Sequence, residues 1–134
     1  GRGEVYLRVP VYVGATAERA RSEPEHSIMQ FYRTLGAQLE GTATAAGARA
    51  SEQRAERGQA LQTVSYDEAL REKVIAGTPQ QVTARLMELR DALGLDGILA
   101  ETNCGGLIPP AQVLASLKLL CREVMPQFKS SVAL

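Results

Sequence analysis

The residues best suited to chemistry gather in a short polar loop, residues 101–106, which follows a predicted strand. Glu101, Asn103 and Cys104 bring a carboxylate, an amide and a thiol to the end of that strand, and two glycines come next. Such groups can bind a conjugated ring or its substrate through hydrogen bonds, and glycines let a backbone approach a ligand closely. The alternative interpretation is structural: Glu101 pairs with an arginine, Asn103 caps the turn, and the glycines only permit its geometry.

A second candidate follows an earlier predicted strand, where Gly77 and Thr78 precede Pro79 at the start of a helix. Backbone N–H groups at a helix N-terminus can bind anions, and the helix dipole adds to the attraction, so this position suits a phosphate group. The alternative is that Gly-Thr-Pro is an ordinary way to begin a helix. The candidate binding residues are therefore Gly77, Thr78, Glu101 and Asn103.

The remaining reactive side chains offer little chemistry. A nucleophilic thiolate needs a base or a cationic neighbour, and no histidine adjoins Cys104 in sequence. His26, the only histidine, lies in the first turn of a predicted helix, where a solvated side chain is more common than a catalytic one. Cys104 and Cys121 lack the spacing of zinc ligands, so we expect no metal site and two buried free thiols in a reducing cytoplasm. No hydrolase or nucleotide-binding motif identifies a catalytic residue.

The elements that must position these residues alternate along the chain. Aliphatic residues occupy every second position of residues 5–13, which predicts a strand with two distinct faces, and Pro10 implies a bulge or a partly unpaired edge in it. Short apolar runs predict two more strands, at residues 73–76 and 97–102, with helices between them. This alternation predicts an α/β sheet of parallel strands, or part of a barrel, with active sites at the carboxyl ends of the strands.

Helix limits are clearest in the second half of the chain. Thr78 as the N-cap and Gln81 three residues later form a capping box, and Gly94 ends this helix. Its apolar face is predicted to contain Val82, Leu86, Leu89 and Leu93. The final helix is predicted to begin near residues 109–110 and to stop before Pro126. It is predicted to bury Val113, Leu117, Leu120, Cys121 and Val124.

The region after the first strand contains a segment with no clear core face. Residues 41–50 are almost all Gly, Ala and Thr, which predicts a mobile loop or a frayed helix, and the charged, Ala-rich residues 51–61 predict a helix. We therefore expect residues 41–65 to be an excursion, or a mobile loop–helix insertion. The chain as a whole, residues 1–134, has the size of one domain.

The composition excludes several classes of partner. Fifteen basic and fifteen acidic residues leave no net charge to attract nucleic acid or anionic lipid, so neither is an expected partner. An apolar content of 45% with 22% charged residues is typical of soluble globular proteins and suggests no membrane span. The chain lacks an initiator Met and a signal-peptide pattern, which suggests a segment that starts partway through a larger protein.

Four stretches in this order resemble the luciferase-like monooxygenases, a flavin-dependent family that includes bacterial-luciferase-type enzymes. They are EPEHSIMQFYR at 23–33, KVIAGTPQQV at 73–82, LDGILAETNCGGLIP at 95–109 and EVMPQF at 123–128. The order and spacing of the four are more specific than any one of them. The resemblance covers most of the chain outside its Ala/Gly-rich part and corresponds to the C-terminal segment of the family.

The resemblance implies a (β/α)₈ TIM barrel, of which this chain would supply about the last three βα units with parallel strands. Family members bind reduced flavin, FMN, or in some branches the deazaflavin F420, at the carboxyl face of the strands. Gly77, Thr78, Glu101 and Asn103 would then lie at the rim of that pocket. Such barrels have about 250 residues or more, and three strands cannot close one, so we expect self-association into a homo-oligomer or a need for the missing half.

The leading hypothesis is that this is the C-terminal part of a cytoplasmic flavin-dependent monooxygenase, which uses reduced flavin and O₂ on a small organic substrate. One alternative is a non-catalytic assembly or interaction segment, because the sequence contains no complete site. The other keeps the fold but uses F420 and hydride transfer. Nothing in the sequence identifies the substrate.

Overall fold

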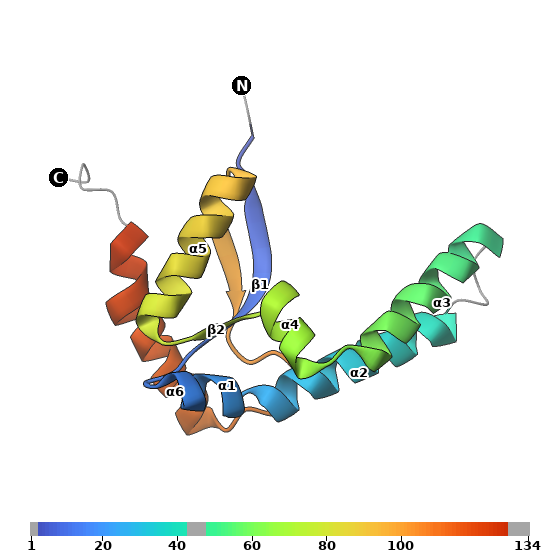
Figure 1. Cartoon of the computed structure of the whole chain (residues 1–134), viewed down its shortest axis with the longest axis horizontal. Helices are drawn as coiled ribbons and strands as arrows, with labels where there is room; N and C mark the ends of the chain where they lie inside the picture. Colours follow the sequence, from blue (N-terminus) through green and yellow to red (C-terminus); the bar gives the residue numbers. More distant parts are fainter. Residues whose placement is uncertain (1–2, 43–47, 129–134) are drawn as a thin grey trace.

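The structure is a computed structural model that describes residues 3–42 and 48–128 (Figure 1). Strands and helices alternate, which confirms the predicted mixed α/β class. The elements in chain order are β1 (Tyr6–Val13), α1 (Ala17–Ser22), α2 (Glu25–Thr42), α3 (Ala48–Thr63), α4 (Tyr66–Glu72), β2 (Ile75–Gly77), α5 (Pro79–Leu93), β3 (Gly97–Glu101), α6 (Pro110–Leu119), the π-helical turn η2 (Leu120–Val124) and the 3₁₀ turn η3 (Met125–Phe128).

The three described strands form one parallel sheet in the order β2-β1-β3. β3 pairs with residues 6–10 of β1, and β2 pairs with residues 11–13. The predicted parallel pairing is confirmed, although in a barrel of consecutive strands β2 would lie between the other two. The three-residue β2 is too short to pair with all of β3, whereas β1 is long enough to pair with each neighbour along a different half.

Pro10 lies in the central strand of the described sheet and not in an edge strand, but it is partly unpaired as predicted, because it has a partner on one side only. It is the last residue of β1 that pairs with β3, opposite Glu101, and the ladder with β2 starts one residue later. Proline has no N–H to donate. Its place at the junction of the two ladders, unpaired on the β2 side, is therefore compatible with a central strand.

The main core covers one face of the sheet. The alternate residues Val9, Val11 and Val13 of β1 are buried there and pack against α5 and η2. Each fully buried aliphatic side chain of this size contributes about 1.5–3 kcal/mol of hydrophobic free energy. The residues that meet them from the helices and from β2 are Ile75, Val82, Leu86, Leu120 and Val124.

Two of the predicted apolar helix faces differ in part from the structure. On α5, Val82 and Leu86 are buried and Leu89 is partly buried, but Leu93 is 55% exposed because it lies in the last turn, beyond the core. In the final helix the buried positions are Ser116, Leu120 and Val124, four residues apart, whereas Leu117 and Cys121 are exposed and Val113 is only partly buried. The prediction of two buried thiols is therefore wrong for Cys121.

The final helix does not stop before Pro126, as the sequence predicted, but changes type. In η2 the N–H of Met125 donates to the carbonyl of Leu120, five residues earlier, and η3 then continues through Pro126. A proline inside an α-helix clashes with the carbonyl four residues before it and removes a donor. The wider π-helical turn and the following 3₁₀ turn let the chain pass Pro126 while Val124 stays in the core.

Helices α2 and α3 form a hairpin that extends away from the sheet (Figure 1). They approach closely at Gly36 and Gly58, where a Cβ on either glycine would lie 2.6 Å from the carbonyl oxygen of the other. The predicted helix at residues 51–61 lies within α3 and is confirmed. Of the segment expected to be a loop or frayed helix, residues 41–42 and 48–50 are helical, and residues 43–47 lie outside the described residues.

No helix within residues 3–42 and 48–128 combines the length and the apolar character needed to cross a membrane.

The close contact between Gly36 and Gly58 predicts that Gly→Ala at this point destabilises the protein, although alanine has the higher helix propensity. Gly→Ala inside a helix normally stabilises it by up to about 1 kcal/mol. In Gly58→Ala the new Cβ collides with the Gly36 carbonyl, so we expect the free energy of unfolding to fall by about 1–3 kcal/mol in urea denaturation. The matched control is Gly41→Ala, whose Cβ would meet nothing within 4 Å and should not destabilise the protein. Equal stability of the two variants would contradict the close approach.

A second stability prediction concerns Ser116, the buried polar residue on the core face of α6. Its hydroxyl accepts a hydrogen bond of 2.8 Å from the backbone N–H of Val13, the last residue of β1. We expect Ser116→Ala to lower the free energy of unfolding by about 1–3 kcal/mol, because the buried Val13 donor loses its partner. Thermal denaturation should show a lower Tm for this variant than for Lys118→Ala, which changes an exposed residue of the same helix. A Tm unchanged from that of the unaltered chain would show that the bond contributes nothing.

Candidate functional site

The carboxyl ends of the strands lie together at one edge of the sheet, but the candidate residues fall into two groups there. Gly77 lies opposite Val13 at the end of β1, and the N–H of Gly14 donates to its carbonyl at 2.9 Å. Glu101 lies on the other side of β1, opposite Pro10. The structure therefore brings Glu101 and Asn103 together in one loop and separates them from Gly77 and Thr78 by the central strand.

The loop after β2 uses most of its donors within its own capping box, which confirms that predicted feature. The N–H of Thr78 donates to Oε1 of Gln81 at 2.9 Å, and the N–H of Gln81 donates to the Thr78 hydroxyl at 3.3 Å. Pro79 has no N–H, and that of Val82 bonds to the Thr78 carbonyl at 2.9 Å. Among the first-turn amides of α5, only that of Gln80 has no partner within the described part of the chain. A phosphate here would thus have one ready backbone donor.

The loop after β3 contains the contacts that the structural interpretation of the sequence expected. Oε1 of Glu101 accepts a hydrogen bond of 2.9 Å from Nε of Arg8 on β1. Asn103 accepts twice, from the N–H of Ile108 on its side chain at 3.0 Å and from the N–H of Gly106 on its carbonyl at 2.9 Å. These contacts define the shape of the loop. They leave the second carboxylate oxygen of Glu101 and the amide NH₂ of Asn103 with no partner among the described residues.

The two glycines of this loop have different surroundings. Both have a positive φ, 90° at Gly105 and 72° at Gly106, which favours glycine at each position. A Cβ on Gly105 would lie 2.1 Å from the carbonyl oxygen of Ser27, whereas one on Gly106 would meet nothing within 4 Å. Gly105 therefore allows the loop to pack on α2. Gly106 presents open backbone at the edge of the sheet.

Ser27 is the residue of this site that the sequence reasoning missed. It is 2% exposed, and its hydroxyl donates to the Cys104 carbonyl at 2.5 Å and accepts from the Leu107 N–H at 2.9 Å. Its place just before Ile28, on the apolar face of the predicted helix, could have indicated burial. No local pattern could have identified partners about 80 positions away, because such contacts depend on how the helix docks.

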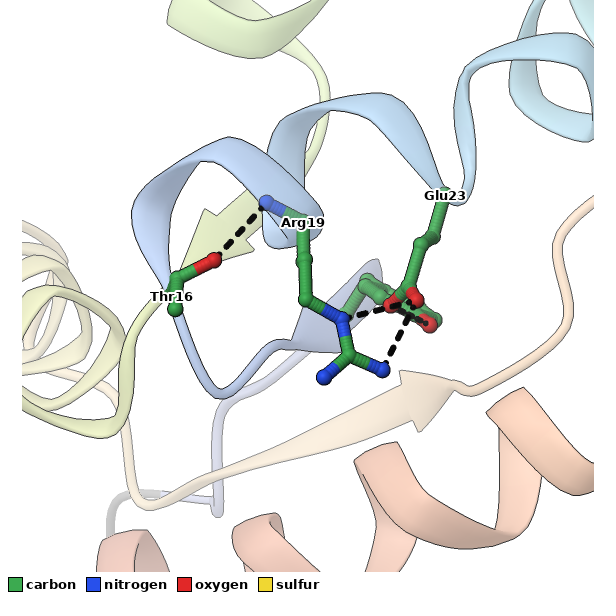
Figure 2. Close-up of polar contacts among 4 residues, drawn as sticks. Thr16, Arg19 and Glu23 are labelled. Atoms are coloured by element: carbon green, nitrogen blue, oxygen red, sulfur yellow. Dashed lines mark hydrogen bonds and ion pairs between the residues drawn. The ribbon is translucent and has the colours of Figure 1, made fainter.

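A polar cluster fixes the segment after β1 at the same edge (Figure 2). The buried Tyr12 donates to Oε1 of Glu23 at 2.7 Å, and Arg19 donates to Oε2 of Glu23 from Nε at 3.3 Å and from Nη2 at 3.2 Å. Figure 2 also shows the Thr16 hydroxyl, which accepts the Arg19 N–H at 3.1 Å as the N-cap of α1. Burial, and then the hydrogen bond to Glu23, raise the pKa of Tyr12, so its phenol stays a donor at neutral pH.

The electrostatics of the β3 loop disfavour thiolate chemistry. Burial, and then the negative charge of Glu101, raise the pKa of the Cys104 thiol to about 11. Tyr32, in the same apolar cluster, has its pKa raised to about 12, mainly by burial and then by Cys104 and Glu101. Cys104 is therefore neutral at physiological pH. No group of His, Cys, Asp or Glu within the described ranges could hold a metal ion.

Cavities at the carboxyl edge are small in the described part of the chain. A hollow of about 10 Å³ between Tyr12, Thr102 and Cys104 has room for about one water molecule. A larger apolar hollow of about 400 Å³ lies near the opposite end of β3, lined by residues such as Gly97, Leu120 and Phe128. The hollow at the carboxyl edge is therefore too small to enclose an aromatic ligand.

Parallel strands with polar loops at their carboxyl edge are the arrangement in which α/β proteins bind ligands. The luciferase-like monooxygenase family model matches residues 1–96, from the start of the chain through β1, the helical hairpin and α5. This is more than half of the 134 residues, so the chain belongs to the luciferase-like monooxygenase family, a family of oxidoreductases. The loop after β3 lies beyond the matched residues. A comparison with curated proteins finds no match.

The two thiols should differ sharply in reactivity. Cys121 is exposed, whereas Cys104 is 4% exposed with its pKa raised to about 11. We expect Ellman's reagent at pH 8 to label one thiol quickly, and Cys121→Ser to remove that reaction. The second thiol should react only after denaturant is added, because its thiolate is both disfavoured and inaccessible. Rapid labelling of two thiols in the native protein would contradict the buried position of Cys104.

Proposed function

We propose that this chain is part of a flavin-dependent monooxygenase that uses reduced FMN and O₂ on a small organic substrate. Its membership of the luciferase-like monooxygenase family supports the reaction class. The proposed cofactor surface is the loop after β3 together with the end of β2, which contain Gly77, Thr78, Glu101 and Asn103. The proposed barrel would require further strands and a different order, because consecutive strands are neighbours in a barrel.

The observation that carries this proposal is the position of the β3 loop beside the end of β1. The connection from β1 leads to β2 on one side, and the chain then crosses to β3 on the other side. In open α/β sheets, ligands bind outside the carboxyl ends of the strands where the connections change direction in this way. The open backbone at Gly106 and the free polar atoms of Glu101 and Asn103 lie at that place.

These residues fit the edge of a flavin ring, which presents both acceptors and an N–H donor. The free carboxylate oxygen of Glu101 would accept from the ring N–H, and the amide of Asn103 would donate to a ring carbonyl. The Gln80 amide next to Thr78 would be the donor for a phosphate. When bound, the reduced flavin supplies the electrons that activate O₂. The protein residues bind and orient the ring, and the Arg8 contact fixes the orientation of the Glu101 carboxylate.

Self-association is a second role that a specific observation favours. β3 is an edge strand of the described sheet, with no proline or lysine to block pairing, and its Leu99 is 60% exposed. Unprotected edges of this kind pair with further strands. We therefore propose that the chain forms a homo-oligomer, whether or not it binds cofactor.

A titration tests the cofactor proposal. We expect saturable binding of oxidised FMN, followed by quenching of its fluorescence, and of reduced FMN, followed anaerobically by absorbance. Glu101→Gln should weaken binding about tenfold, because a charge-assisted hydrogen bond becomes a neutral one. The matched control is Glu88→Gln, which neutralises an exposed carboxylate on α5 and should leave the affinity unchanged.

The other outcomes separate the alternatives. Binding of F420 in place of FMN would replace oxygenation with hydride transfer on the same surface. A chain that binds neither cofactor and forms a stable oligomer in size-exclusion chromatography would be an assembly segment, and the cofactor proposal would be wrong. Equal FMN affinity for both Glu→Gln variants would remove Glu101 from the site.

A further inference from the structure

We propose that Ser27 is the positioning residue that holds the β3 loop in its ligand-binding conformation. The inference rests on the proposed function, because it assigns the loop of residues 102–108 to the cofactor surface. Ser27 lies in the first turn of α2, is buried, and contacts the loop through Cys104 and Leu107. It therefore acts through the loop and does not touch the ligand.

The two hydrogen bonds of Ser27 connect both halves of the loop to one side chain. Its hydroxyl donates to the Cys104 carbonyl at 2.5 Å and accepts from the Leu107 N–H at 2.9 Å. A serine hydroxyl can donate and accept at the same time, which alanine cannot do. In the absence of this hydroxyl, a backbone donor and a backbone acceptor lose their partners in a buried or partly buried position.

Backbone packing places the loop directly on Ser27. A Cβ on Gly105 would lie 2.1 Å from the Ser27 carbonyl oxygen and 2.8 Å from its Oγ. On either side of this contact, the Cys104 and Ile108 side chains are buried. The loop is thus in contact with α2 through backbone, hydroxyl and side chains, with no space for a water layer between them.

The internal bonds of the loop do not depend on Ser27. Asn103 closes a turn through the N–H groups of Gly106 and Ile108. The loop can therefore keep its local shape after Ser27 is changed, yet lose its fixed place against α2. This separates positioning from folding of the turn and makes the proposal testable.

The test compares Ser27→Ala with Ser27→Thr, which keeps the hydroxyl, and with Ser22→Ala, a matched control at an exposed serine of α1. Two quantities are measured on the full chain: amide hydrogen exchange of residues 102–108, and FMN affinity by fluorescence titration. We expect Ser27→Ala to speed exchange at the Leu107 amide about tenfold and to weaken FMN binding about tenfold, and Ser27→Thr to restore both. Ser22→Ala should change neither quantity.

A second pair of variants keeps the test decisive if Ser27→Ala does not fold. Gly105→Ala and Gly106→Ala both place a Cβ at a positive-φ position of the loop, but only the first collides with Ser27. Exchange at residues 102–108 should therefore be faster in Gly105→Ala than in Gly106→Ala. Equal exchange in this pair would overturn the proposal.

The outcomes also distinguish this inference from the proposed function. If the unaltered chain binds neither FMN nor F420, the proposed function is wrong, and the exchange data alone decide whether Ser27 holds the loop. If the unaltered chain binds FMN and Ser27→Ala loosens the loop without a change in affinity, the positioning role is overturned while the proposed function stands. Unchanged amide exchange at residues 102–108 in a folded Ser27→Ala variant also overturns the positioning role.

Discussion

The rest of the structure depends on the pairing of β1 with a different neighbour along each half. Because β3 covers only residues 6–10, the last three residues of β1 extend beyond it and are bordered by β2 on one side. The end of the strand is fixed from three directions: Gly14 bonds to Gly77, Val13 bonds to Ser116, and the valine side chains are buried beneath α5 and η2. The candidate loops are positioned by this one strand end.

In the β3 loop, the side chains that make structural contacts also keep further polar atoms free. Glu101 uses one carboxylate oxygen for Arg8, and Asn103 uses its carbonyl oxygens to close the turn. Each of these contacts fixes the orientation of a second polar group on the same side chain. Rigid, pre-oriented polar groups bind with a smaller loss of conformational entropy than mobile ones. The structural contacts that the sequence suggested as an alternative to function are therefore compatible with the binding role that we propose for this loop.

Local sequence patterns predicted the features whose causes are local. Alternation identified β1, and the Thr78–Gln81 capping box identified the start of α5. The sequence could not predict which strand lies at the centre. The long β1 takes that place because the three-residue β2 is too short to pair with all of β3. Which face of the final helix is buried depends on how the helix docks on β1, where Ser116 bonds to Val13, so the exposure of Cys121 could not be predicted locally. Ser27 was missed for the same reason.

The hairpin of α2 and α3 connects the contact between Ser27 and the β3 loop to a distant part of the molecule. α2 is an 18-residue helix that starts at the β3 loop, so its length is about 27 Å at 1.5 Å per residue. The backbone contact between Gly36 and Gly58 joins the two helices into a stiff arm. A tilt of about 10° at the Ser27 end would move the far end of α2 by about 5 Å over that length. A force applied to the far end of the hairpin would therefore act as a torque on the contact between Ser27 and the β3 loop.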